Sequence, residues 1–204
     1  MKIGAEILGA GLLFGMVPLE ASAQSQWQPV EQIQTYSITG DSGVDLYASI
    51  GERGPKIGKE VRAIAHTNFK LTWTRDYRPQ PDGACTLVSA RPKLIITYTL
   101  PKPASALSPE LKRKWDAFFT GVHKHELVHG VIITDMVKEI ERVSVGLSVA
   151  DDPKCVKIRT ELTAKLGEIS KAQQKRSSDY DRMEMGEGGN VHQLILQLVN
   201  GPGR

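Results

Sequence analysis

The sequence predicts an α+β domain in which a small antiparallel sheet packs against one long helix and a second helix that returns beside it. Between residues 30 and 101, apolar side chains alternate with polar ones in short runs, as on half-buried strands. Between residues 108 and 199, they recur every three or four positions, as on helices that pack on a core. The chain is 40% hydrophobic and 24% charged, as ordinary globular proteins are, so we expect a single domain over residues 24–204.

Residues 1–23 have the pattern of a cleaved signal peptide. The apolar run from Ile7 to Val17 is too short to span a bilayer, and Pro18 ends it. Ala21-Ser22-Ala23 then supplies the small side chains that a signal peptidase requires. The alternatives are a disordered tail or, without cleavage, a short membrane anchor. We expect an exported protein, periplasmic or secreted, that has no membrane contact after its leader is cleaved.

Turn residues divide the β-rich half into short elements. Phe69, Leu71 and Trp73 share one face of an alternating run, which predicts a half-buried strand. Pro101 is expected to end the last strand, because proline cannot donate to a sheet ladder. The same reasoning predicts strands at Gln32–Thr39, Asn68–Arg75, Cys85–Ser89 and Lys93–Leu100, a helix at Val44–Glu52 and a turn at Pro79–Gly83.

The helical half begins with a clear start signal, since Ser108 can cap a helix whose first residue is Pro109. A break at residues 151–153 separates this helix from a second one, which is expected to fade near Ser177 and Ser178. Glycines at 186, 188 and 189 then precede a short last helix. The apolar stripe of the first helix comprises Leu111, Trp115, Phe118, Val122, Ile132, Ile133, Met136, Ile140 and Val143.

The chain has two cysteines, Cys85 and Cys155, one in each half. In an exported protein such a pair favours a disulfide, and a closed loop of 70 residues would contribute about 4 kcal/mol in the chain-entropy model. The alternative is two buried free thiols. Neither cysteine has the spacing of a zinc finger, so a cysteine-ligated metal is not expected.

The motif His125-Glu126-Leu127-Val128-His129 lies in the middle of the long predicted helix. Residues four apart share one face, so the two histidines can bind one zinc ion. Glu126 lies about 100° around the helix and can reach a water on the metal without being a ligand. We therefore expect a Zn²⁺ site in which the zinc-bound water attacks a carbonyl group and Glu126 acts as the general base.

The alternative to a metal site is a pair of core histidines bonded to backbone groups. Both fall where the apolar stripe would place leucine or isoleucine. Two imidazoles beside a carboxylate are costly in a core unless something satisfies them, and a metal ion does so directly. His123 is expected on the far surface of the helix, and His66 has no identifiable partner.

A catalytic zinc usually has three protein ligands and one open position. On a continuous helix Asp135 points away from the metal, and Glu139 lies too far along the axis. If the second helix returns antiparallel, residues 171–175 are level with the motif, so its end or the loop after it can supply the ligand. The candidates there are Asp179, Tyr180, Asp181 and Glu184, and we favour Asp181. For each carboxylate the alternative is a solvated loop side chain.

With these residues the chain resembles the DUF922 proteins, a bacterial family described as predicted secreted zinc-dependent proteases. The HExxH motif is the specific part of the resemblance. Looser similarity covers most of the mature chain, including Thr35–Gly40, Asn68–Arg75 with Trp73, Leu100-Pro101 and Lys114-Trp115. The resemblance implies a zincin-like hydrolase.

The chain departs from this family near its C-terminus. The family has a Tyr-Asp element followed closely by a Thr-x-His-Gly element. Tyr180-Asp181 matches the first, but residues 182–187 contain no histidine. His192 could replace it only with a loop shift. If the family histidine is the third ligand, this chain must use another group or bind the metal less tightly.

The motif and the resemblance together predict an exported zinc metallopeptidase with peptide or protein substrates. The alternative is a non-catalytic periplasmic protein that binds zinc or has a structural role. The absent histidine favours that alternative, whereas the intact Glu126 argues against it, because a structural zinc needs no glutamate beside its first ligand. The net charge is +3 with both signs intermixed, and we find no nucleic-acid-binding pattern.

Overall fold

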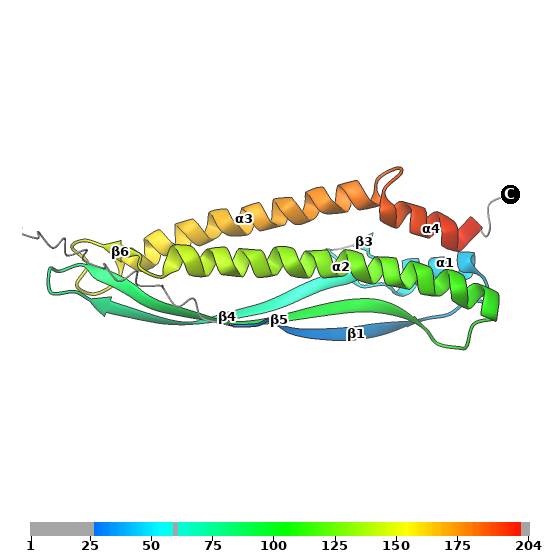
Figure 1. Cartoon of the computed structure of the whole chain (residues 1–204), viewed down its shortest axis with the longest axis horizontal. Coiled ribbons are helices and arrows are strands. Elements are labelled where there is room, and N and C mark those ends of the chain that lie inside the picture. Colours follow the sequence, from blue (N-terminus) through cyan, green and yellow to red (C-terminus); the bar gives the residue numbers. More distant parts are fainter. Residues whose placement is uncertain (1–26, 59–60, 201–204) are drawn as a thin grey trace, which may run out of the picture.

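The computed structural model describes residues 27–58 and 61–200 of the 204-residue chain. They form an elongated molecule in which a sheet and two long helices run along one axis (Figure 1). The elements are β1 (Val30–Ile38), α1 (Gly43–Arg53), β2 (Lys56–Ile57), β3 (Val61–Arg62), β4 (His66–Pro79), β5 (Cys85–Pro103), α2 (Pro109–Ser144), β6 (Ser148–Val149), α3 (Lys157–Met185) and α4 (Asn190–Asn200). The predicted leader lies outside the described residues. None of the helices described is long and apolar enough to cross a membrane.

The fold is α+β, as predicted, but the sheet is mixed, so the prediction of an antiparallel sheet was wrong. The strand order is β1-β5-β4, with β4 antiparallel and β1 parallel to β5. Parallel neighbours need a long connection. Here the chain passes through α1, the β2–β3 hairpin and β4 before β5 returns beside β1. β4 is left as an edge strand, with β5 as its one neighbour among the residues that the structure describes.

β5 is one continuous strand, where the sequence predicted two shorter strands that end before Pro101. The positions of its prolines explain the difference. Pro92 precedes Ile95, where the pairing of β5 with β1 begins. Pro101 follows Thr99, where the pairing of β5 with β4 ends. Both prolines therefore lie where β5 has a single neighbour, and there a missing N–H is tolerated.

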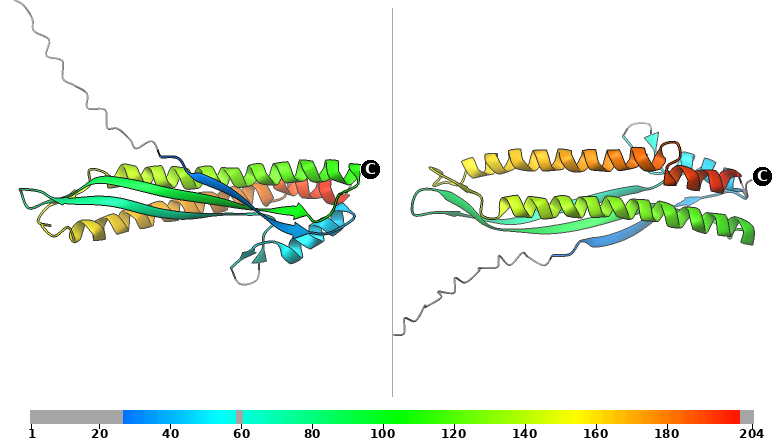
Figure 2. Two further views of the ribbon diagram at one scale, coloured as in Figure 1. Left: turned by 90° about the horizontal axis from the view of Figure 1, so that it is seen from below. Right: turned by 45° about the horizontal axis from the view of Figure 1, so that its top comes forward.

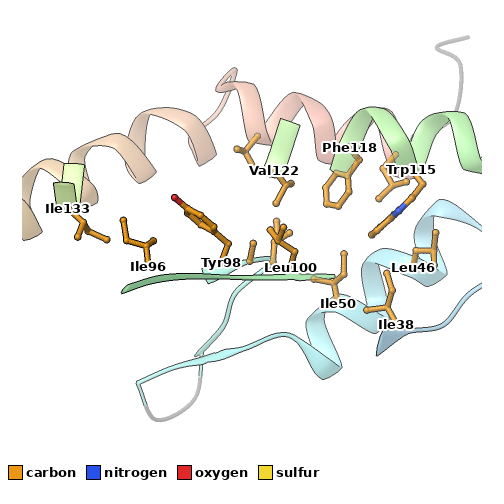
Figure 3. Close-up of a cluster of buried hydrophobic side chains, with 14 of the residues drawn as sticks. Ile38, Leu46, Ile50, Ile96, Tyr98, Leu100, Trp115, Phe118, Val122 and Ile133 are labelled. Carbon is orange, nitrogen blue, oxygen red and sulfur yellow. The ribbon is translucent and has the colours of Figure 1, made fainter. Parts of the chain in front are cut away.

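α2 begins as predicted, with the Ser108 hydroxyl accepting the Leu111 N–H and Pro109 in the first turn. The apolar stripe of α2 packs on one face of the sheet, and α3 packs along α2. The view from below shows no helix of the described chain on the other face of the sheet (Figure 2). Between α2, α1 and the sheet lies the main core (Figure 3). Its largest fully buried side chains include Tyr98, Phe118, Ile38, Leu46, Ile96 and Leu100.

α2 approaches the sheet most tightly at Gly130. A Cβ atom on Gly130 would lie 2.1 Å from the hydroxyl oxygen of Tyr98. That hydroxyl donates to Glu31 Oε1 of β1 at 2.7 Å, so the tyrosine is fixed from both sides. This close approach limits the distance between the sheet and the part of α2 that carries the histidine motif. Gly121 has a similar role at α4, where a Cβ atom would meet the Leu194 side chain.

α3 continues to Met185, about two turns beyond the end that the sequence predicted near Ser177. Side-chain contacts along the helix span this stretch: Gln173 Nε2 donates to Ser177 Oγ at 3.1 Å, and Lys175 pairs with Asp179. Such contacts between residues four apart support a helix even where it has few apolar residues. The candidate third ligand is therefore held on the helix itself, which is one of the two locations that the sequence left open.

A disulfide joins Cys85 to Cys155, as predicted, with a Cα–Cα distance of 5.3 Å. It links the start of β5 to the turn that precedes α3. Beside it the buried carboxylate of Asp152 accepts the N–H groups of Val156 at 2.8 Å and Ile158 at 2.9 Å. The first turn of α3 is thus fixed to the sheet at the end of the molecule opposite α4.

Candidate metal centre

Three potential ligand atoms converge where α2 and α3 face each other. His125 Nε2 lies 3.1 Å and His129 Nε2 lies 2.9 Å from Asp181 Oδ1. The two Nε2 atoms lie 3.1 Å apart. The histidines share a face because they are four residues apart on α2, and α3 runs antiparallel and brings Asp181 opposite them. Among the described residues these are the three that could hold a metal ion together.

Protons alone do not satisfy this cluster. If both Nε2 atoms carry hydrogen and donate to Asp181, the two N–H groups face each other across 3.1 Å. If one of them lacks hydrogen, its lone pair faces the carboxylate. A cation between the three atoms attracts all three lone pairs. Tetrahedral zinc with bonds of about 2.0–2.1 Å places its ligand atoms about 3.3 Å apart, close to the separations found here.

The outer nitrogens of both imidazoles have polar groups beside them, as metal-bound histidines usually do. His129 Nδ1 lies 3.3 Å from Ser177 Oγ. His125 Nδ1 is buried and has no hydrogen-bond partner, but Glu184 Oε2 lies 4.0 Å away. The ring of Tyr180 stacks on that of His125, with centroids 4.8 Å apart and planes inclined by 18°. These contacts fix both ring orientations, so the residues present fit a metal ion.

The electrostatics of the cluster favour a positive charge. Burial by itself lowers the pKa of His129, but the hydrogen bond and charge of Asp181, with the charge of Glu126, outweigh it and raise that pKa. Burial by itself raises the pKa of Asp181, whereas its hydrogen bonds from both histidines hold the pKa well below its usual range. The site therefore combines an ionised carboxylate with two imidazoles, and ligands of these kinds are found at zinc sites.

Glu126 is buried beside the cluster, with only 5% of its surface exposed. The Thr67 hydroxyl of β4 donates to Glu126 Oε2. Glu126 and the three converging residues line one cavity of about 470 Å³. The rest of its wall is largely apolar and includes Ile57, Phe69, Val122, Ile133, Met185 and Val191. A metal ion held by the cluster would have its open position at a cavity large enough for part of a substrate.

Three of the other acidic candidates are engaged elsewhere. Asp179 pairs with Lys175 and Arg182. Asp135 accepts from Arg176, and Glu139 from Arg142. Each of these ion pairs lies on the surface. Asp135 and Glu139 thus stay outside the cluster, as the helical geometry predicted.

The three histidines outside the motif have different surroundings. His192 Nδ1 accepts the Gly188 N–H at 3.2 Å, so it is not part of the cluster. His123 is half-buried against Tyr98, with ring centroids 6.1 Å apart, and not on the far surface that we predicted. Its ring lies beside those of Tyr98 on β5 and Phe119 on α2. His66, which had no partner in the sequence, lines the cavity.

Sequence reasoning missed Thr67 and the position of Ser177 in the site. Thr67 is 59 residues from Glu126 in the sequence and lies on a different element. Ser177 is one of two serines that we interpreted as a fading helix end. Neither has a local pattern that marks it, because both owe their roles to long-range packing.

A family model described as "Bacterial protein of unknown function (DUF922)" matches residues 33–189. The matched segment contains the histidine motif, Thr67 and Asp181. No curated protein and no solved structure matches the chain.

Proposed function

We propose that this chain, which belongs to the DUF922 family, is a zinc-dependent hydrolase of zincin-like architecture that cleaves peptide bonds. The observation that carries the proposal is the convergence of His125, His129 and Asp181 in the same cavity as a buried Glu126. Three protein ligands beside an open cavity are typical of a catalytic zinc, whereas a structural zinc is closed by four.

The chain supplies each role that peptide hydrolysis needs. His125, His129 and Asp181 would hold the metal, which supplies a polarising charge for a carbonyl group and acidifies a water. Glu126 would act as the general base, taking a proton from the attacking water and returning it to the leaving amine. Tyr180 and Ser177 keep the imidazoles oriented.

The edge of β4 offers a place for an extended peptide. The Phe69 N–H donates to Asn68 Oδ1 at 2.7 Å and so faces away from β5. Backbone groups alternate in direction along a strand, so the N–H and C=O of Thr67 face the same free edge. A peptide that pairs there would lie beside the cavity, in the mode of strand addition. The zincin-like mode is an analogy at the level of the fold.

The chain is proposed to act outside the cytoplasm. The Cys85–Cys155 disulfide supports an oxidising compartment, because such bonds persist in the periplasm and in secreted proteins. The predicted leader agrees with this location.

Metal removal tests the proposal directly. Zinc-loaded protein is incubated with casein, stripped with a chelator, and reloaded with one equivalent of zinc. We expect hydrolysis to disappear on stripping and to return on reloading, because the attacking water depends on the metal. Hydrolysis that survives stripping would contradict a zinc-dependent mechanism. No hydrolysis at any zinc level would leave the alternative of a non-catalytic zinc-binding protein.

A further inference from the structure

The Glu126 carboxylate has a single hydrogen-bond partner among residues 27–58 and 61–200, the hydroxyl of Thr67. The two residues come from different elements, since Thr67 lies on β4 and Glu126 on α2. The same hydroxyl lies 3.2 Å from the backbone carbonyl of Glu126. A hydroxyl carries one hydrogen, and the charged carboxylate at the shorter distance is the stronger acceptor.

Because of this contact, the two carboxylate oxygens of Glu126 have different surroundings. Oε2 accepts from Thr67. Oε1 accepts no hydrogen bond within the described chain. It is also not one of the fully buried polar atoms that lack a partner, so part of its surface is accessible. Oε1 is therefore left open toward the cavity, where it can take a proton. A general base works only when it is held within hydrogen-bond reach of that proton.

Thr67 also lies on the free edge of β4, where its backbone N–H and C=O face away from β5. One residue thus presents its backbone to the place proposed for a peptide and its hydroxyl to the base. We propose that Thr67 is a positioning residue, which holds Glu126 Oε2 so that Oε1 faces the reacting water and which aligns the base with a peptide bound at the edge of β4. This inference rests on the proposed function.

The test compares two substitutions at Thr67 in the zinc-loaded full chain. Thr67→Val keeps the shape and suits a strand but removes the hydroxyl, whereas Thr67→Ser keeps the hydroxyl. Labelled casein is the substrate, and zinc content is measured for each variant. We expect Thr67→Val to lower kcat by about 10- to 100-fold with unchanged KM and one zinc per chain, and Thr67→Ser to stay within about threefold of the wild type.

Each outcome separates the two proposals. Hydrolysis that depends on Glu126 but survives Thr67→Val overturns the role of Thr67 alone. An equal loss in the valine and serine variants, with zinc retained, also overturns it, because the hydroxyl would then not matter. If the wild type and Glu126→Gln are equally inactive with zinc bound, the proposed function fails and the positioning role fails with it.

Discussion

Replacing Glu126 by glutamine is expected to lower casein hydrolysis by about 10²- to 10⁴-fold while the zinc content stays unchanged. Glutamine has nearly the same shape and can still accept from Thr67, but it cannot take a proton from water. Glu126 is not among the converging ligands, so we expect its replacement to leave metal binding unchanged. Hydrolysis rate and zinc content are measured on the same preparations.

Glu139→Gln is the matched control for this substitution. Glu139 lies on the same helix, but its carboxylate is on the surface and pairs with Arg142. Its replacement is expected to leave the rate within about twofold, since exposed ion pairs contribute little. Equal rates for the wild type and Glu126→Gln would show that Glu126 is not the base, and rates at background in both would favour a non-catalytic zinc protein.

Removal of the disulfide should have the largest effect on stability. The bond closes a loop with a sequence separation of 70, and the chain-entropy model gives about 4 kcal/mol for a loop of this length. The closed loop contains all of β5 and all of α2. The bond also keeps the first turn of α3 against the sheet. The double variant Cys85→Ala/Cys155→Ala is therefore expected to unfold at a much lower denaturant concentration.

Reductant provides the control for the disulfide prediction. It should lower the unfolding midpoint of the wild type toward that of the double variant and leave the variant unchanged. The free energy of unfolding is obtained from denaturant titrations with the two forms side by side. An unchanged midpoint in the oxidised wild type and the variant would mean that packing near Asp152 fixes this end of the molecule without the bond.

Local patterns predicted the elements whose signals lie close together in the chain. Ser108 and Pro109 mark the start of α2, and the spacing of His125 and His129 places both rings on one face. The disulfide followed from the number of cysteines and the expected compartment. In each case the relevant residues are sequence neighbours or have no competing partners.

The sequence could not predict features that depend on distant neighbours. β1 pairs in parallel with the edge of β5 that β4 does not occupy. The prolines of β5 are tolerated because each lies where β5 has one neighbouring strand. The length of α3 depends partly on Ser177, whose hydroxyl faces His129 across the helix pair. Asp181 and Ser177 lie beside the histidines although the sequence placed residues 171–175 level with them. The residue that we favoured as third ligand was nevertheless Asp181.

The most direct test of the account is the zinc content of the purified protein, measured by elemental analysis beside the variants His129→Ala and Asp181→Ala. The account predicts about one zinc per chain in the wild type. It also predicts loss of that zinc in His129→Ala and a clear decrease in Asp181→Ala, because three ligands hold the ion. No zinc in the wild type after zinc is supplied at neutral pH would contradict the account, as would equal zinc contents in all three proteins.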